Sequence, residues 1–205
     1  MHNDNAPRLI LASQSAARRA MLKSAGVVFD VVASTIDEDA IRATMISESD
    51  CHEAADIAAV LAFEKARSVA LAHPGCYVLG SDQVLALGRY MFSKAATLAE
   101  ARDNFDRLRG RTHELVSAAA LVRNDEVIWQ GVDTAQLTMR RFSDAFLDDY
   151  LGRVGDRVLK TVGGYEIESD GLQFFDRIDG DYFTILGMPL LPVLHQLRSH
   201  GVVAS

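Results

Sequence analysis

The sequence predicts an α/β protein in which helices pack around a mixed β-sheet. Strand-like and helix-like segments alternate in the first half of the chain, and pairs of strands dominate its middle. Segments that alternate in this way bury the apolar faces of sheet and helices against each other. With 205 residues and no repeats, low-complexity tracts or Pro/Gly/Ser-rich linkers, the chain is expected to form one domain over residues 1–205.

The first half begins with an apolar run, Leu9–Ala12, which is typical of a buried strand. A helix is predicted from about Ser15 to Ala25, where Gly26 ends it, and a long helix over Ala54–Ala72, where apolar residues recur at four-residue steps. Further strands are predicted over Val27–Ala33, Tyr77–Leu87 and, after a hairpin tip at Gly88-Arg89, Tyr90–Phe92.

Capping residues mark the helices of the second half. Thr97 and Glu100 are spaced as a capping box, which predicts a helix that ends at Gly110, and Ser143 is expected to cap a short helix. A last helix is predicted over Leu190–His200. Between these helices lie two predicted strands joined around Asn124-Asp125, namely Glu114–Val122 and Glu126–Met139.

Composition excludes several classes of protein. The net charge is −7, whereas proteins that bind nucleic acids or membrane surfaces need a basic face. No apolar run approaches the roughly 18 residues of a membrane-spanning helix, and Met1–Asn5 lacks the basic-then-apolar order of a signal peptide. Cys51 and Cys76 are too few for a disulfide framework or a zinc site. We therefore expect a cytoplasmic protein that binds neither nucleic acid nor membranes.

An anion-binding site is predicted where the first strand meets its helix. The apolar run ends at Ser13 and Ser15, and Arg18 follows as the helical pattern begins. Free backbone N–H groups and the positive end of the helix dipole favour anions at such a start, and the hydroxyls and guanidinium add donors. The alternative is a serine-capped helix whose arginines are exposed to solvent.

Carboxylates at two positions need an explanation. Asp82 lies within an otherwise apolar strand, so it is expected to face a polar cleft, a cation or a metal, unless the strand is an edge strand in solvent. Ser13 and Asp82 are both predicted at or near strand ends, where α/β sheets bind ligands. The acids Asp37, Glu38 and Asp39 suit Mg²⁺, although a solvated loop is the simpler interpretation of the triplet alone.

Lysines complete a set of groups suited to phosphate chemistry. Lys65 interrupts the apolar stripe of the long predicted helix, so its ammonium either reaches the surface or points into a cleft. The first is the simpler interpretation of this lysine alone, and Lys94 and Glu168 are individually unremarkable. Together, however, such cations bind phosphates, such carboxylates hold Mg²⁺, and a carboxylate orients or deprotonates a water molecule.

The residues described above, in this order and at these spacings, resemble those of the Maf family of nucleotide pyrophosphatases. The resemblance extends over nearly the whole length of the chain. The family's opening pattern, L-A-S-x-S-P-R-R, corresponds to Leu11–Arg18, with Ala16 in place of proline and Ala17 in place of the first arginine. Further family motifs match Asp37-Glu38, Glu64-Lys65-Ala66, Ser81-Asp82-Gln83, Lys94 (followed by Ala95 instead of proline), Gly110–His113, Gly163–Tyr165 and Gly187–Leu190.

The resemblance implies a homodimer whose chains each have an elongated mixed sheet flanked by helices, with a cleft between two lobes as in Maf and ITPase-like proteins. It also implies hydrolysis of a nucleoside triphosphate between the α and β phosphates, with a divalent metal, Mg or Mn. Asp82 matches the family's proton acceptor, and its phosphate- and metal-binding positions match Ser13, Ser15, Arg18, Glu38, Lys65 and Lys94.

We assign a role to each charged residue of this set from the charge of its side chain. We assign Arg18, Lys65 and Lys94 to charge neutralisation on the triphosphate. Glu38, with or without Asp82, is assigned to the metal. Which of these two acids is the ligand and which activates water stays open.

The family's specificity positions match Ala17, Gln83 and Glu168. Gln and Glu at the last two resemble the branch that prefers 7-methyl-GTP, whereas the dTTP/UTP branch has Thr and Gln there. A carboxylate at Glu168 can accept hydrogen bonds from guanine N1–H and its exocyclic amine, while thymine and uracil offer one N3–H between carbonyls. Ala17 leaves a gap where a large residue could border the base. The alternative is therefore a wider range of substrates or a preference for another nucleotide, such as dTTP or UTP.

Two other functions fit parts of the pattern. A non-catalytic nucleotide sensor or cell-division regulatory protein would bind phosphates without activating water, and the alanines at family positions fit a loss of catalysis. The presence of Asp82, Glu38, Lys65 and Lys94 favours an enzyme instead. A hydrolase of a non-nucleotide phosphoanhydride would have no need of the base-reading Glu168.

Overall fold

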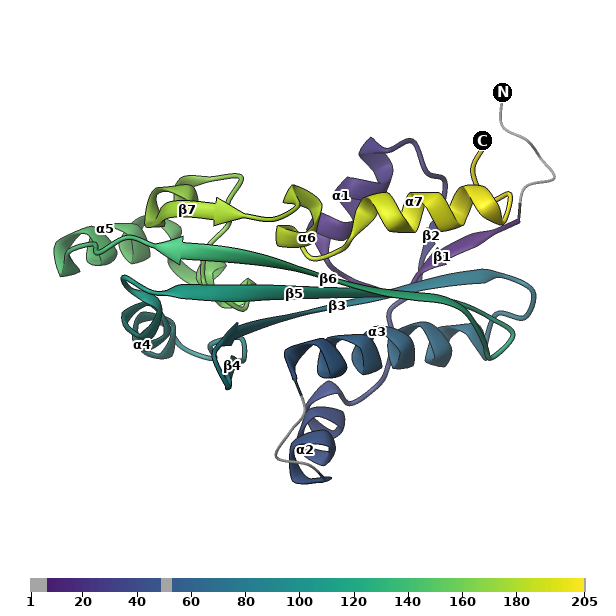
Figure 1. Ribbon diagram of the computed structural model, residues 1–205, viewed down its shortest axis with the longest axis horizontal. Coiled ribbons are helices and arrows are strands. Elements are labelled where there is room, and N and C mark those ends of the chain that lie inside the picture. The colour runs from purple at the N-terminus through teal and green to yellow at the C-terminus, as the bar shows by residue number, and fades with distance from the viewer. Residues whose placement is uncertain (1–6, 49–52, 205) are drawn as a thin grey trace. The chain divides into compact units, whose positions relative to one another are not determined.

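The computed structural model describes residues 7–48 and 53–204, so Met1–Asn5 and Cys51, considered above, lie outside it. The chain divides into two compact units. Unit 1 takes its described residues from Met1–Gln83, Val116–Asp133 and Asp181–Ser205, and unit 2 consists of Val84–Leu115 and Thr134–Gly180. Each unit is therefore built from separate stretches of the sequence (Figure 1).

The strands form a seven-stranded sheet with the order β2-β1-β3-β5-β6-β7, and β4 pairs with β3 beside this path. β1 pairs in parallel with β2 and β3, whereas β4 pairs antiparallel with β3, and β7 antiparallel with β6. The sheet is therefore mixed, which confirms the predicted α/β class. The strands are β1 (Leu9–Leu11), β2 (Asp30–Val31), β3 (Tyr77–Leu87), β4 (Tyr90–Phe92), β5 (Thr112–Arg123), β6 (Glu126–Met139) and β7 (Phe175–Asp179).

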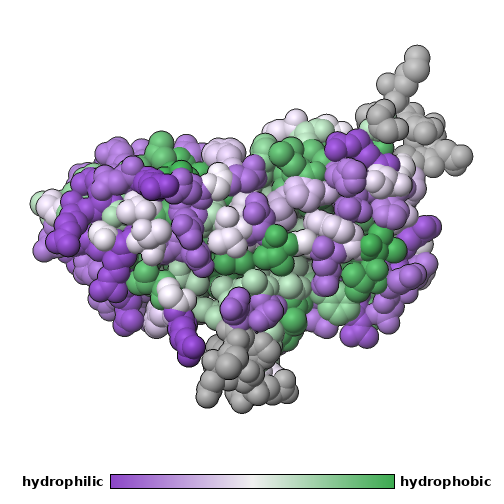
Figure 2. Space-filling model, viewed as in Figure 1, coloured by the Kyte–Doolittle hydropathy of each residue, from purple (hydrophilic) through white to green (hydrophobic). Residues whose placement is uncertain are grey.

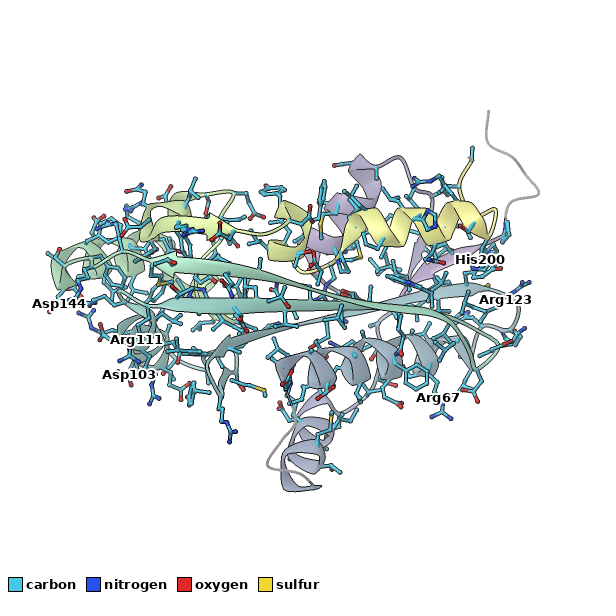
Figure 3. The ribbon with its side chains drawn as sticks, in the orientation of Figure 1. Arg67, Asp103, Arg111, Arg123, Asp144 and His200 are labelled. Atoms are coloured by element: carbon cyan, nitrogen blue, oxygen red, sulfur yellow. The ribbon has the colours of Figure 1, made fainter. Side chains whose placement is uncertain are left out.

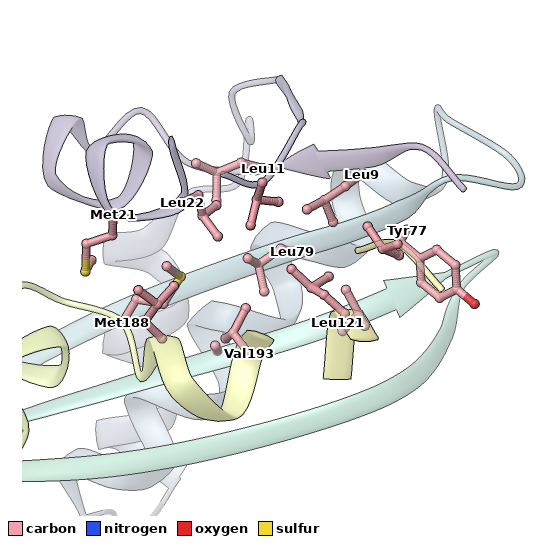
Figure 4. Packing of buried hydrophobic residues seen from close by; sticks show 14 residues of the cluster. Leu9, Leu11, Met21, Leu22, Tyr77, Leu79, Leu121, Met188 and Val193 are labelled. Carbon is pink, nitrogen blue, oxygen red and sulfur yellow. The ribbon is translucent and has the colours of Figure 1, made fainter. Parts of the chain in front are cut away.

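In unit 1, helices cover both faces of the sheet. α1 (Ala16–Ser24) and α7 (Leu190–Ser199) lie on one face, and α3 (Ala54–Ala70) lies on the other (Figure 1). Side chains at the first strand alternate between these layers, because Leu9 and Leu11 join the core with α1 and α7, whereas Ile10 packs with α3. Figure 4 shows the first core, and each fully buried leucine in it stabilises the fold by roughly 1.5–3 kcal/mol.

Unit 2 is built around an aromatic core. The buried rings of Phe105, from α4 (Leu98–Leu108), and Phe174, from the 3-10 helix η2 (Asp170–Phe174), have centroids 4.6 Å apart. Tyr150 of α5 (Asp144–Val154) packs edge-on against both, and the 3-10 helix η1 (Gly155–Lys160) contacts α4 and α5. Hydrophilic residues cover much of this unit's surface in the view of Figure 2.

The predicted elements agree with the structure to within two residues at each end, with one exception. Of the strand predicted over Val27–Ala33, only β2 forms, and it lies at the edge of the sheet. β-Branched residues favour a strand only where they pack against neighbours, and Val28, which lies outside β2, is exposed. The prediction lacks α2 (Glu38–Glu48), α6 (Tyr182–Ile185), β7, η1 and η2.

The longest helix of the described residues is α3, with 17 residues. Its sequence includes Asp56, Glu64, Lys65 and Arg67. Within the ranges that the structure describes, no helix combines the length and the apolar character needed to cross a membrane.

Candidate active site

Lys65 lies on α3 and is only 7% exposed. Its Nζ atom lies 2.7 Å from Oδ1 of Asp82 and 2.8 Å from Oε2 of Glu38. The interpretation of Lys65 as a lysine that extends to the surface is therefore wrong. One ammonium and two carboxylates, each from a different element, meet at one place in unit 1.

Asp82 lies on β3, which has neighbours on both sides in the sheet, and it is 4% exposed. The prediction that it lies at or near a strand end is wrong, because β3 continues to Leu87. Parallel pairing with β1, however, ends at Leu79, so Asp82 lies beyond the carboxyl end of β1. Its carboxylate faces cations, as expected, since Lys65 contacts Oδ1 and an Nη atom of Arg42 lies 3.0 Å from Oδ2.

The helix α2 supplies two of these groups. Asp37 caps it by accepting a hydrogen bond from the N–H of Ala40 at 2.9 Å, and Glu38 lies in its first turn, where acids complement the helix dipole. Glu38 and Asp39 thus belong to a helix instead of the loop considered for this triplet, while Asp37 and Asp39 are exposed to solvent. Arg42 lies one turn after Glu38, on the same side of the helix. Arg42 is not among the residues predicted from the sequence, and the signal that points to it is this spacing after a capping aspartate.

Gly80 determines how closely α3 approaches β3. A Cβ atom at Gly80 would lie 2.1 Å from the backbone oxygen of Ala62 and 2.7 Å from the backbone nitrogen of Ala66. Any side chain there would push α3 away from the strand. Because Lys65 precedes Ala66 on this helix, the glycine sets how far the ammonium reaches toward Asp82.

The start of α1 forms as the sequence predicts. Ser15 caps the helix, its Oγ accepting from the N–H of Arg18 at 3.4 Å. Arg18 is buried, so the interpretation of an exposed arginine is wrong for this residue. Its Nε donates to the carbonyl of Gly187 at 2.8 Å, and one Nη donates to Ser13 Oγ at 3.2 Å and to the carbonyl of Ser81 at 2.8 Å. The guanidinium thus joins three segments of unit 1.

Arg18 also interacts electrostatically with the carboxylates of the site. Burial lowers the pKa of Arg18 below its usual range, and the charges of Asp82 and Glu38 oppose this shift. Since a guanidinium stays protonated in proteins, Arg18, Arg42 and Lys65 give this cluster one more positive than negative charge. A local surplus of this kind suits an anion although the whole chain has a charge of −7.

Gln83 is fixed by a hydrogen-bond network. Its Nε2 donates to Ser117 Oγ at 3.1 Å and to the carbonyls of Thr184 and Ile185 at 3.0 Å each. Because carbonyl oxygens only accept, the amide must turn its nitrogen toward them and keep Oε1 for other donors. Ala17, another predicted specificity residue, lies half-buried in the first turn of α1.

Lys94 and Glu168 belong to unit 2. Lys94 is exposed after β4, and Glu168 is exposed between η1 and η2. A buried pair anchors the segment before Glu168, with His113 Nε2 and Tyr165 Oη 2.6 Å apart. Burial lowers the pKa of His113 to about 4 and raises the pKa of Tyr165, so both side chains are neutral at pH 7.

Unit 1 therefore contains most of the predicted site residues, whereas Lys94 and Glu168 belong to unit 2. The subset in unit 1 consists of Ser13, Ser15, Ala17, Arg18, Glu38, Lys65, Asp82 and Gln83.

Several known proteins are similar to this chain. The sequence pattern of the family described as "Maf-like protein" matches residues 8–200. A 7-methyl-GTP pyrophosphatase from Rhizobium meliloti is 46% identical over 96% of this chain and 98% of its own. A nucleoside triphosphate pyrophosphatase from Caulobacter vibrioides is 48% identical over 94% and 96% of the two chains. A 7-methyl-GTP pyrophosphatase from Brucella abortus is 44% identical over 93% and 95%.

The chain belongs to the Maf family, which confirms the resemblance in its motifs. Among solved structures, a HAM1 protein from Coxiella burnetii is 20% identical and covers 66% of this chain and 74% of its own, with a TM-score of 0.43. That similarity is too low for any inference about the site.

Proposed function

We propose that this Maf protein hydrolyses the α–β phosphoanhydride of a nucleoside triphosphate to the monophosphate and pyrophosphate, with 7-methyl-GTP as its preferred substrate. One observation supports this proposal above all: Asp82 and Glu38 converge on the single cation of Lys65. Phosphoanhydride hydrolysis needs positive charge at the phosphates and a carboxylate for water at the same place. The names of the relatives fit this reaction.

Asp82 is the proposed proton acceptor. The strand β3 and the helix α3 hold it on rigid elements, which keeps its carboxylate in place to orient or deprotonate the attacking water. Lys65 and Arg18 neutralise the charge that grows as pyrophosphate leaves. The other proposed phosphate-binding residues are Ser13, Ser15 and Lys94.

Glu38 and Asp82 also fit a divalent metal, Mg or Mn. Their oxygens lie 2.8 and 2.7 Å from the same Nζ atom, and carboxylate oxygens are the ligands that these ions prefer. In the described ranges, no three His, Cys, Asp or Glu residues gather as a metal site, so substrate phosphates would supply further ligands. When bound, the ion supplies charge neutralisation on the phosphates.

Glu168 and Gln83 are proposed to read the base. The Glu168 carboxylate suits the paired N–H donors of guanine, and a cationic 7-methylguanine ring adds electrostatic attraction. Gln83 keeps its Oε1 atom for a donor because its amide nitrogen is already bound to carbonyls. Ala17 leaves space at the remaining specificity position, so dTTP and UTP are the alternative substrates.

The test is a screen for pyrophosphate release with Mg²⁺ or Mn²⁺ over 7-methyl-GTP, GTP, UTP, CTP, dTTP and ATP. Asp82→Asn should lose activity by about a hundredfold or more while it still binds nucleotide. Asp103→Asn, which changes an exposed carboxylate on α4 (Figure 3), is the matched control and should retain activity.

Each outcome selects one hypothesis. Preference for 7-methyl-GTP, lost in Asp82→Asn, supports the proposal. Preference for UTP or dTTP supports the proposed enzymatic activity but overturns the assignment of 7-methylguanine as the preferred base. No release from any nucleotide favours a non-catalytic sensor or cell-division regulatory protein.

The base assignment has its own test. Glu168→Gln should reduce the preference for 7-methyl-GTP over UTP more than it reduces the rate on the best substrate. Glu166→Gln is the control, since the Glu166 carboxylate pairs with Arg157 at 2.7 Å. Equal changes for all bases in Glu168→Gln would overturn the assignment and would favour a hydrolase that does not recognise the base.

The proposal includes a single domain over residues 1–205, a cytoplasmic location and a homodimer. The location rests on the small number of cysteines, and the dimer rests on the family resemblance. Light scattering of the purified protein tests the dimer directly.

A further inference from the structure

Arg42 binds the second carboxylate oxygen of Asp82, the proposed proton acceptor. Its Nη atom lies 3.0 Å from Asp82 Oδ2, while Lys65 occupies Oδ1 at 2.7 Å. A water molecule or a metal ion that approached this carboxylate would compete with both cations. Neither the motifs nor the proposed function assigns a role to Arg42.

The two cations differ in their freedom to move. The side chain of Arg42 is 23% exposed, whereas that of Lys65 is 9% exposed and is also bound to Glu38. Among the described residues, Asp82 is the one ion-pair partner found for Arg42. Arg42 is therefore the cation that can leave Asp82 at the lower cost.

The helix α2 also borders a hollow. This open, mostly apolar hollow of about 380 Å³ lies along α2 and α3, which contact each other elsewhere. Residues of both helices line it, namely Ala40, Ile41, Thr44, Met45, Val60 and Glu64. A helix beside such a space can shift without breaking a close-packed core.

The geometry points to Arg42 as a phosphate-binding residue that moves from Asp82 to the triphosphate when substrate binds; this inference rests on the proposed function. In the exchange, Asp82 gives up a cation and becomes accessible to the metal ion that accompanies the substrate. The guanidinium gives up one carboxylate and gains phosphate oxygens, which match its fork of N–H donors. Asp82 keeps Lys65 as a partner, and Arg42 keeps an anionic partner, throughout the exchange.

The experiment compares Arg42→Gln and Arg42→Lys with Arg67→Gln. Arg67 (Figure 3) lies on α3 and pairs with Asp125 at 2.6 Å, so it is a matched ion-paired arginine outside the site. Calorimetry measures binding of inorganic pyrophosphate with Mg²⁺, and pyrophosphate release gives kcat and KM on the best nucleotide. Thermal unfolding checks that each variant folds.

Arg42→Gln should weaken pyrophosphate binding and raise KM by about tenfold to a hundredfold, because a hydrogen bond to a charged group is lost. The Mg²⁺ concentration for half-maximal activity should not rise, since no competitor for Asp82 remains. Arg42→Lys should recover part of the binding, and Arg67→Gln should match the wild type. A variant that merely damages the fold would instead raise both KM and the Mg²⁺ requirement.

Unchanged or tighter binding of pyrophosphate to Arg42→Gln would overturn the inference. So would a wild-type protein that binds no pyrophosphate. Wild-type protein that binds pyrophosphate through Arg42 but hydrolyses no nucleotide would overturn the proposed function and leave Arg42 as an anion-binding residue. The two failures are therefore distinguishable.

Discussion

Lys65 and Asp82 form a buried ion pair, with side chains 9% and 6% exposed and Nζ 2.7 Å from Oδ1. The transfer of two such charges from water into a protein costs several kcal/mol, and a well-packed apolar pair is often more stable. Stability alone is therefore a poor explanation of this pair. Its position beside Glu38 and Arg42 is explained better by a need for fixed charges where phosphates bind.

Replacement of Lys65 should affect activity strongly. Lys65→Gln removes the ammonium between Asp82 and Glu38, so we expect kcat/KM for pyrophosphate release to fall by about a hundredfold or more. Lys23→Gln, at an exposed position in the last turn of α1, should leave kcat/KM unchanged. Full activity of Lys65→Gln would show that this ammonium has no part in the reaction.

Gly80 should be intolerant of any side chain. Gly80→Ala should reduce the free energy of unfolding by about 1–3 kcal/mol, because its Cβ would collide with the backbone of Ala62 and Ala66. It should also lower kcat, since α3 positions Lys65. Urea unfolding measures the first effect. Gly152→Ala in α5 is the control, because a Cβ there meets open space and should be neutral or stabilise by up to about 1 kcal/mol.

The orientation of Gln83 leads to a third prediction. Gln83→Glu would direct a carboxylate at the carbonyls of Thr184 and Ile185, which can only accept hydrogen bonds. The lost hydrogen bonds should reduce the free energy of unfolding by about 1–3 kcal/mol at pH 7. The same change at exposed Gln130 of β6 should have little effect. Equal melting temperatures for the two variants would contradict the network.

The stability of the fold should depend on His113 in acid. Burial lowers the pKa of His113 in the folded protein to about 4, below the 6.5 of an unperturbed histidine. Between these values the unfolded chain binds a proton that the folded protein does not, so acidification favours unfolding. The stability that His113 contributes is complete above pH 6.5 and declines toward pH 4, by roughly 3 kcal/mol in total.

Urea unfolding at several pH values tests this dependence. The slope between pH 4 and pH 6.5 should be smaller in His113→Gln than in the wild type, because the variant lacks the titrating ring. His195→Gln, which removes an exposed histidine, should keep the wild-type slope. Identical slopes in all three proteins would contradict the predicted role of burial.

Local signals in the sequence are sufficient for most of the fold. Ser15 caps α1, Ser143 caps α5, and Thr97 Oγ1 accepts from the N–H of Glu100, as their spacing predicts. The reciprocal half of the predicted capping box differs, because the Glu100 carboxylate accepts from the N–H of Ala96 instead of Thr97. Asn124-Asp125 forms the turn between β5 and β6 with positive φ angles of 51° and 66°. These features depend on residues that are close in the sequence, so a single sequence is enough to predict them.

The environment of the site depends on contacts between distant segments. The sequence by itself determined which residues were candidates, because an aspartate in an apolar strand and a lysine in an apolar stripe break a local pattern. It could not determine that Lys65 meets both Asp82 and Glu38, that Arg18 is buried on backbone carbonyls, or that Arg42 reaches Asp82. The contacts of Lys65 and Arg42 follow from the approach of α3 to β3 at Gly80 and from the position of α2, whereas those of Arg18 follow from the packing of α1 near Ser81 and Gly187. Only packing of the whole chain fixes these distances, and the charges at the site interact through them.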